Sequence, residues 1–364
     1  MSAPVAPLSA EDLDHVLAHT RELWAEAHGA SFFITGGTGF FGRWLLESFG
    51  RANDSLALGM RATVLTRDPA AFARKAPHLA ARADLTFVPG DMRSFAFPPG
   101  RFAYVIHAAT DTALPAAGSD PNEIKNTIVD GSRRVLDFTA QAGVRKFLLT
   151  SSGAVYGSQP ADLTHVPEDY AGRPDPAAPG SGYGLGKLIS EEWCTERARR
   201  DGYECKIARC FAFVGPHLPL DAHFAIGNFI RDARRGGPVQ VAGDGTPMRS
   251  YLYAADLAVW LWTLLFRAPS GRPYNVGSDD DRPIAAHARC VHELCGIKAP
   301  VRIARSPVPG EPVRRYVPAI RRARDELGLR VRITEEEGIR RTLGWLGGAP
   351  GDFSSQSHRA GAPN

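Results

Sequence analysis

The stretch Ser31-Phe-Phe-Ile-Thr-Gly-Gly-Thr-Gly-Phe-Phe-Gly42 decides how the rest of the chain can fold. Its first four residues are bulky and mostly apolar, which is typical of a short buried strand. Gly36, Gly39 and Gly42 follow at intervals of three residues, and residues 43–49 have the apolar spacing of a helix. The pattern therefore predicts a strand, a tight glycine turn and a helix in direct succession.

This succession is typical of a dinucleotide-binding site. Glycine lets a diphosphate approach the bare main chain, because a Cβ would block that approach or forbid the required φ. The N-terminus of the following helix attracts negative charge. A G-x-x-G-x-x-G spacing is a weak signal alone, and an ordinary tight turn is the alternative, but the flanking strand and helix favour the dinucleotide site. We therefore expect NAD or NADP as the cofactor.

The composition limits the class of protein. At 364 residues the chain can form one large α/β domain or two unequal ones. The net charge of +4 is modest, and acidic residues are interleaved with the arginines, so we expect no nucleic-acid partner. The five cysteines form no C-x-x-C pair, which indicates reduced thiols and no metal site. Without a signal peptide or an apolar run near ~18 residues, the chain is expected to be cytoplasmic, with no membrane partner.

Strand and helix patterns alternate after the glycine turn. Helical patterns cover residues 127–142, 183–200 and 256–266. Further strands are predicted at residues 62–66, 85–91, 104–110, 146–152, 206–213 and 274–277. This alternation indicates an α/β fold with a Rossmann-type, doubly wound parallel sheet.

The domain boundaries follow from where the alternation stops. The residues before the glycine turn contain a predicted helix from Ser9 to about His28, which either packs on the outside of the domain or takes part in dimerisation. The predicted units are an N-terminal extension (1–30), an NAD(P)-binding domain (31–215, with a contribution from 250–277), a smaller mixed α/β substrate-binding domain (216–249 and 278–346), and a disordered tail (347–364).

The end of the second predicted strand bears on the choice between NAD and NADP. An acidic residue there would accept hydrogen bonds from the adenosine ribose. The sequence has Arg67, which favours the 2′-phosphate of NADP, followed by Asp68, which still suits NAD. The third strand ends in a Gly-Asp turn, and its Asp91 is predicted to lie beside the adenine.

Three polar side chains suggest the chemistry. Tyr183 and Lys187 are four residues apart in a helical stretch, so they share one face. A lysine ammonium beside a tyrosine lowers the phenol pKa from about 10, which makes the phenolate an accessible base. Ser152 lies at the C-terminal end of the fifth predicted strand, the edge where ligands bind. Beside a nicotinamide, this trio predicts proton removal from a secondary alcohol while hydride leaves its carbon, or the reverse.

From Phe32 to Leu346 the chain resembles the extended short-chain dehydrogenase/reductases, specifically the NAD-dependent epimerase/dehydratase family that acts on nucleotide sugars. The motifs that carry the resemblance are Thr35-Gly-Gly-Thr-Gly-Phe-Phe-Gly42, His107-Ala-Ala109, Ser151-Ser-Gly-Ala-Val-Tyr-Gly157, Tyr183-x-x-x-Lys187, Arg209 with Gly215-Pro216, Gly243-Asp-Gly245 followed by Arg249, Asp256, and Tyr274-Asn-Val-Gly277.

The resemblance implies a nucleotide-sugar substrate, a homodimer, and Ser152, Tyr183 and Lys187 as the catalytic residues. It also implies that Arg249 contacts the diphosphate of the sugar nucleotide. With the residues discussed above, the predicted cofactor-binding residues are Gly36, Thr38, Gly39, Phe40, Phe41, Gly42, Arg67, Asp91, Met92, Ala108, Ala109, Tyr183, Lys187 and Phe211. The predicted substrate-binding residues are Ser152, Gly153, Asn228, Arg249 and Arg314.

Three departures from the family pattern limit the reaction. In the family's 4,6-dehydratases the residue equivalent to Ser152 is followed by Asp and Glu, but here Gly153 and Ala154 follow, and they cannot transfer protons. The decarboxylases keep a Glu where Ala154 lies, so dehydration and decarboxylation are both disfavoured. Ala212 replaces the usual Asn of an R-x-F-N stretch, which removes a polar contact to the sugar nucleotide.

The expected function is NAD(P)-dependent oxidoreduction at C4 of a nucleotide-diphosphate hexose. The Ser151–Gly157 stretch resembles 4-epimerases, whereas the missing acidic residue at Arg67 favours a 4-keto-reductase that uses NADPH. The alternatives are a nucleotide-sugar 4,6-dehydratase or decarboxylase, or a non-catalytic NAD(P)-sensing binding protein with the same fold.

Overall fold

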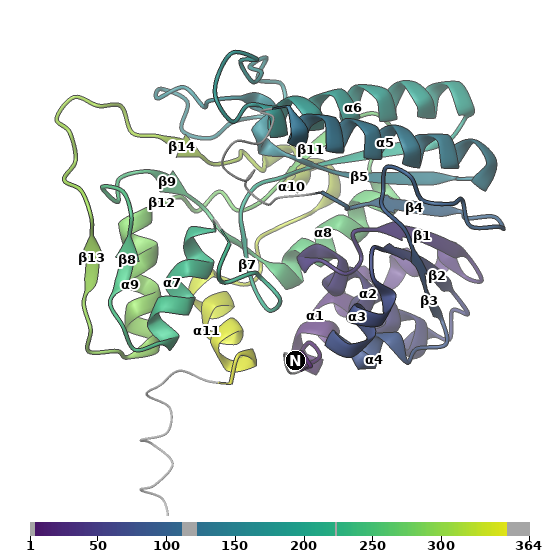
Figure 1. The fold of residues 1–364 in the computed structure, drawn as a ribbon, viewed down its shortest axis with the longest axis horizontal. Helices are drawn as coiled ribbons and strands as arrows, with labels where there is room; N and C mark the ends of the chain where they lie inside the picture. Colours follow the sequence, from purple (N-terminus) through teal and green to yellow (C-terminus); the bar gives the residue numbers. More distant parts are fainter. Residues whose placement is uncertain (1–3, 111–121, 223, 348–364) are drawn as a thin grey trace, which may run out of the picture.

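The computed structural model describes residues 4–110, 122–222 and 224–347, so the predicted tail lies almost wholly outside the described residues. Its centre is a seven-stranded sheet with the order β11-β6-β5-β4-β1-β2-β3 (Figure 1). The strands are β1 (Ser31–Thr35), β2 (Arg61–Thr66), β3 (Leu85–Pro89), β4 (Tyr104–His107), β5 (Lys146–Ser152), β6 (Glu204–Cys210) and β11 (Pro273–Val276). All neighbours are parallel, and the order reverses between β1 and β4. The predicted doubly wound sheet is confirmed, and the reversal marks its ligand-binding edge.

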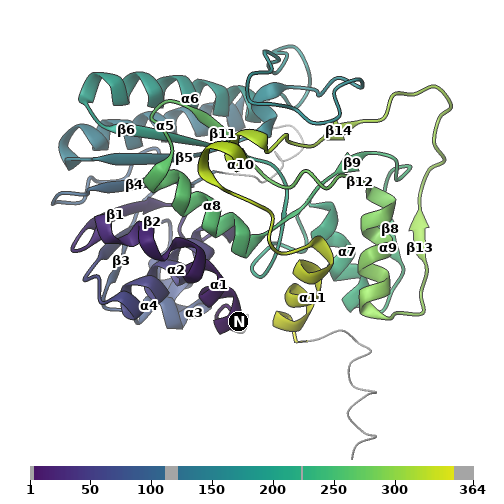
Figure 2. The same ribbon diagram turned by 180° about the vertical axis from the view of Figure 1, so that it is seen from behind.

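The central strand β1 is buried on both faces, as a parallel strand requires. Phe32 and Ile34 belong to one core cluster and Phe33 belongs to another, because successive side chains point to opposite faces. The first cluster includes α2 (Phe40–Leu56) and α8 (Ala254–Arg267), and the second includes α5 (Glu123–Ala142) and α6 (Gly182–Asp201). Helices therefore cover both faces of the sheet, as Figure 2 shows from behind.

The N-terminal extension packs on the outside of this domain. Its helix α1 (Ala10–Thr20) contacts α2 and α8, and the chain then continues as a 3₁₀-helix over Arg21–Ala27. The predicted single helix from Ser9 to His28 is therefore two segments of different pitch. Trp24 is fully buried and packs against Trp262 of α8, which fixes the second segment to the sheet domain.

The same extension also reaches the end of the chain, at α11 (Glu335–Trp345). Asp12 accepts hydrogen bonds from the Tyr253 hydroxyl at 2.8 Å and from Arg341 at 2.9 Å. The Trp345 indole donates to the Pro7 carbonyl at 2.9 Å. The extension therefore joins the sheet domain to the last helix of the described chain.

A smaller mixed α/β lobe stands beside the C-terminal edge of the sheet (Figure 1). It contains a two-stranded sheet of β8 and β13 and a three-stranded sheet of order β12-β9-β14.

The α-helices and strands of both parts that have not yet been given bounds are α3 (Pro69–Lys75), α4 (Pro77–Ala80), α7 (Ala225–Arg234), α9 (Ile284–Cys295), α10 (Arg321–Leu327), β7 (Phe213–Val214), β8 (Val239–Val241), β9 (Met248–Arg249), β10 (Leu252–Tyr253), β12 (Arg282–Pro283), β13 (Val301–Ile303) and β14 (Arg315–Tyr316).

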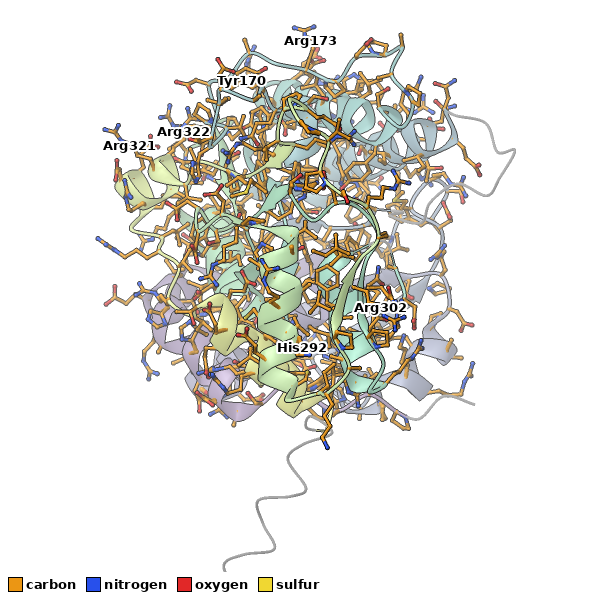
Figure 3. All side chains as sticks on the ribbon, turned by 90° about the vertical axis from the view of Figure 1, so that its left-hand side faces the viewer. Tyr170, Arg173, His292, Arg302, Arg321 and Arg322 are labelled. Carbon is orange, nitrogen blue, oxygen red and sulfur yellow. The ribbon has the colours of Figure 1, made fainter. Side chains whose placement is uncertain are left out.

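Figure 3 views this end of the molecule. Tyr170 and Arg173, from the loop before α6, lie at the top, and His292 of α9 and Arg302 of β13 lie below them on the smaller lobe. The C-terminal ends of the strands therefore lie between this loop and the smaller lobe. Across the described ranges, no helix is both long enough and apolar enough to cross a bilayer.

Candidate functional site

The glycine turn after β1 packs closely against the end of β4. Gly36 has a φ of +74°, and a Cβ on it would lie 2.4 Å from the carbonyl carbon of Ala108. A Cβ on Gly42 would lie 2.2 Å from the Gly36 carbonyl oxygen. These two glycines allow the turn, α2 and the Ala108–Ala109 segment to meet, which is how the structure brings the predicted cofactor residues together.

The N-terminus of α2 fits a diphosphate. Gly39 is the N-cap, is exposed and carries no side chain that could cap the helix, so the first N–H groups of α2 are available to a ligand. A Cβ on Gly39 would meet only the Gly36 carbonyl oxygen, at 3.4 Å. Thr38, Phe40 and Phe41 are half-buried around it. The predicted dinucleotide would therefore lie against main chain here.

The adenosine end of the site is bounded by β2 and β3. Arg67 is exposed just after β2, whereas the Asp68 carboxylate caps α3 by accepting from the Ala71 N–H at 2.8 Å. The Asp68 carboxylate is therefore occupied as the cap of α3, whereas the Arg67 side chain is exposed to solvent. Asp91 lies past the end of β3 and accepts from the Arg93 Nε at 2.7 Å, which holds the pKa of Asp91 below its usual range.

Two predicted cofactor residues pack against neighbours. The Met92 side chain lies against Gly131 of α5, where a Cβ would come within 2.8 Å of it. The Phe211 ring lies against Gly153, where a Cβ would come within 2.5 Å of Cζ. An aspartate at position 153, as in the dehydratases, would therefore collide with Phe211 in this arrangement.

The predicted catalytic residues converge at the end of β5. Ser152 is the last residue of β5, and its Oγ accepts from the Ala154 N–H at 3.1 Å. Tyr183 and Lys187 lie in the first two turns of α6. Lys187 is buried, and its Nζ donates to Thr110 Oγ1 at 2.5 Å and to the Thr150 carbonyl at 2.8 Å.

The pKa of Tyr183 differs from the expectation. Burial raises it to about 12, and the facing Ser152 hydroxyl acts in the opposite direction. The predicted lowering by Lys187 is wrong for this arrangement, because the ammonium is directed at Thr110 and the Thr150 carbonyl. Burial also lowers the pKa of Lys187, to about 8. With a pKa of about 12, the Tyr183 hydroxyl stays protonated near neutral pH in this arrangement.

A second phenol lies in the site and was missed by the sequence analysis. Tyr316, on β14, places its hydroxyl 3.3 Å from Ser152 Oγ, and its ring lies 4.7 Å from that of Phe211. The pairing of β14 with β9 brings it there from the far end of the chain. No local motif marks it, because the surrounding arginine-rich segment resembles a solvated surface.

The two arginines that are predicted to bind the substrate, Arg249 and Arg314, lie in different environments. Arg249 is half-buried, with its guanidinium carbon 5.8 Å from the centre of the Tyr316 ring. Within the described ranges it makes no ion pair with a carboxylate, and its NH1 donates to the Met248 carbonyl at 2.7 Å. Arg314 is 79% exposed and pairs with Glu311 at 3.5 Å, outside this group.

Asn228 lies on α7 and is half-buried. Its Oδ1 accepts from the Arg231 guanidinium at 3.0 Å, so part of its polar capacity is used within its own helix. The structure thus brings Ser152, Tyr183 and Lys187 together, with Tyr316 and Arg249 facing them from the smaller lobe.

Comparison with known proteins shows the family of this chain. The model described as "NAD dependent epimerase/dehydratase family" matches residues 32–277. The chain belongs to this family. Its NAD dependence confirms the predicted dinucleotide cofactor, and the match covers the glycine turn and the Ser152–Tyr183–Lys187 group.

Individual relatives of this epimerase/dehydratase family member are named for different reactions. UDP-glucuronic acid decarboxylase 1 of Xenopus tropicalis is 29% identical over 239 residues, which is 66% of this chain and 55% of the relative. The chain thus matches little more than half the length of that relative. UDP-glucose 4-epimerase of Thermotoga maritima, solved with UDP-glucose, has a TM-score of 0.72 at 22% identity, covering 87% of this chain and 98% of the other. UDP-glucose 4-epimerase of Thermus thermophilus, solved with NAD, has a TM-score of 0.70 at 25% identity, covering 88% and 99%.

Proposed function

We propose that this protein catalyses NAD(P)-dependent oxidoreduction at C4 of a nucleoside-diphosphate hexose, as a 4-epimerase or a 4-keto-reductase. The observation that carries the proposal is the meeting of Ser152, Tyr183 and Lys187 at the strand end beside the glycine turn, with an Arg249 that has no carboxylate partner in the described residues. A secondary alcohol or ketone can be held there by its oxygen, and a diphosphate can be held by Arg249.

The roles follow from the environments. NAD, when bound, supplies the acceptor or donor of hydride. Tyr183, whose pKa is about 12, donates its proton to a ketone oxygen during reduction and takes it back from the alcohol during oxidation. Ser152 hydrogen-bonds the same substrate oxygen. Lys187 provides a positive charge beside the proton transfer, which is stronger in a buried site.

Decarboxylation is the second candidate, because the relative from Xenopus tropicalis is named a UDP-glucuronic acid decarboxylase. Ala154 carries no carboxylate, and Gly153 has no room for a side chain beside Phe211, so we expect neither CO2 release from UDP-glucuronic acid nor dehydration of a 4-keto intermediate. A radiometric assay for CO2 release would detect the first activity and would displace our proposal. A non-catalytic NAD(P)-binding protein would show no turnover with any nucleotide sugar.

Retention of the cofactor distinguishes the two proposed reactions. An epimerase returns the hydride to the same substrate, so it has no need to exchange its nicotinamide, whereas a reductase must. We expect the protein to release its nicotinamide on dialysis, because Arg67 is the free group at the ribose end and favours exchangeable NADPH. The ultraviolet absorbance of the dialysed protein measures this. Nicotinamide that remains bound would instead identify the epimerase.

The diphosphate assignment makes a prediction about Arg249. UDP or dTDP at about 100 times Kd should raise the melting temperature by about 4 °C, because a ligand of the folded state stabilises it by about 2.7 kcal/mol. Arg249→Ala should remove most of this shift and leave the NAD(P)-induced shift unchanged. Arg314→Ala is the matched control, since it removes an arginine that is 79% exposed. Equal stabilisation by free sugars would contradict the nucleotide-sugar assignment.

We also propose that the protein acts as a cytoplasmic homodimer. Four of the five cysteines are buried, as expected of reduced thiols. Light scattering of the purified protein measures the oligomeric state directly.

A further inference from the structure

A buried histidine and glutamate lie behind the small β12-β9-β14 sheet. His287 is on the first turns of α9 and Glu335 is the first residue of α11, and their side chains are 0% and 3% exposed. His287 Nδ1 lies 2.6 Å from Glu335 Oε1. His287 Nε2 lies 3.1 Å from both the Arg249 and the Arg282 carbonyl oxygens.

These contacts fix the protons of the pair. A ring nitrogen that faces two carbonyl oxygens must carry a hydrogen, because a carbonyl can only accept. The other ring nitrogen, Nδ1, shares a hydrogen bond with Glu335 Oε1. Glu335 Oε2 is buried without a partner in the described residues, so the contact with His287 is what compensates the buried carboxylate. The pair therefore holds together as one unit with Nε2–H directed at the sheet.

The target of that N–H is the strand that carries Arg249. Arg249 and Arg282 are register partners in the antiparallel β9–β12 pair, so one imidazole N–H bridges both strands at that point. The His287 ring also meets the Tyr251 ring edge-on, with centroids 4.8 Å apart. The main chain of Arg249 is thereby held from behind, while its side chain lies over Tyr316 on the side of the site.

We propose that the His287–Glu335 pair is a positioning device for Arg249, which fixes the arginine main chain so that the guanidinium meets the substrate diphosphate. This inference rests on the proposed function, in which Arg249 binds that diphosphate. His287 is thus a positioning residue, since it acts through the Arg249 carbonyl and touches no substrate. A preorganised cation binds more tightly than one that must be ordered on binding.

The test measures Kd for UDP and for NAD by titration calorimetry in single variants. His287→Phe keeps an aromatic ring and removes all three hydrogen bonds of the imidazole, so Kd for UDP should rise about tenfold, or ~1.4 kcal/mol. Glu335→Leu should act in the same direction. His287→Gln and Glu335→Gln are the matched conservative variants, because a glutamine amide can donate in place of His287 Nε2–H and can accept in place of the Glu335 carboxylate. Both should stay within about threefold of the parent. Kd for NAD should not change in any of the four.

A double-variant cycle separates positioning from a general loss of stability. If His287 acts through Arg249, then adding His287→Phe to Arg249→Ala should weaken UDP binding no further. Additive losses, parallel losses of NAD binding, or unchanged UDP binding in His287→Phe and Glu335→Leu would each overturn the inference while leaving the proposed function intact. Failure of the parent protein to bind any nucleoside diphosphate would instead overturn the proposed function, and the inference with it.

Discussion

Tyr183→Phe should lower turnover by about 10²–10⁴-fold, the usual contribution of a positioned acid or base. The substitution removes only the hydroxyl that we propose exchanges a proton with the substrate oxygen, and it keeps the ring at the start of α6. Kd for NAD(P) and for UDP should remain near the parent values, so the loss should appear in kcat. Steady-state rates with a 4-keto or 4-hydroxy nucleotide sugar provide the measurement.

Tyr316→Phe is the matched control, because the Tyr316 hydroxyl also lies 3.3 Å from Ser152. Tyr316 has no lysine one turn further along a helix, and it reaches the site from the smaller lobe on β14. We expect a loss below about tenfold for it, the size of one neutral hydrogen bond. A larger loss in Tyr316→Phe than in Tyr183→Phe would show that the two phenols have been assigned the wrong way round.

Gly36→Ala should weaken NAD binding by about 100-fold, or ~2.7 kcal/mol, and should also lower the melting temperature. The new Cβ would lie 2.4 Å from the Ala108 carbonyl carbon, and a φ of +74° is strained for alanine. The turn and the end of β4 must therefore separate, which displaces the helix N-terminus that is predicted to bind the diphosphate. Fluorescence titration with NADH and a melting curve measure the two effects.

Gly39→Ala tests the cofactor site without the strain. Its φ is −82°, which alanine adopts readily, and its Cβ would meet only the Gly36 carbonyl oxygen, at 3.4 Å. The melting temperature without cofactor should stay within about 1 °C of the parent, while NAD binding should weaken because the methyl group stands where the diphosphate approaches. Unchanged NAD affinity in Gly39→Ala would place the diphosphate elsewhere.

Much of the fold could be predicted from the sequence because its signals are local. The apolar runs of β1, β2 and β5 and the spacing of the glycines each lie within one short segment. The errors fall in the N-terminal helix, which is two segments of different pitch, and where a strand ends. The predicted strand over residues 206–213 is divided, since β6 stops at Cys210 and β7 begins at Phe213 on a different sheet.

The site could be predicted only in part, for the same reason. Ser152, Tyr183 and Lys187 carry recognisable local spacing, whereas Tyr316 reaches Ser152 across 164 residues of chain through the pairing of β14 with β9. The pKa of Tyr183 also escaped prediction. A spacing of four residues indicates that Lys187 is near, but the direction of its ammonium depends on Thr110 and the Thr150 carbonyl, which only the folded structure supplies.

The contact between Pro7 and Trp345 has a consequence for how the chain is made. The two residues are separated by 338 positions, so at about 5–20 residues per second the ribosome finishes the second one tens of seconds after the first. During that interval α1 has left the ribosome but lacks Tyr253 and Arg341, the partners of Asp12. The N-terminal extension is therefore synthesised before α8 and α11, the later parts of the chain that hold it, and it completes its contacts only when α11 has been made.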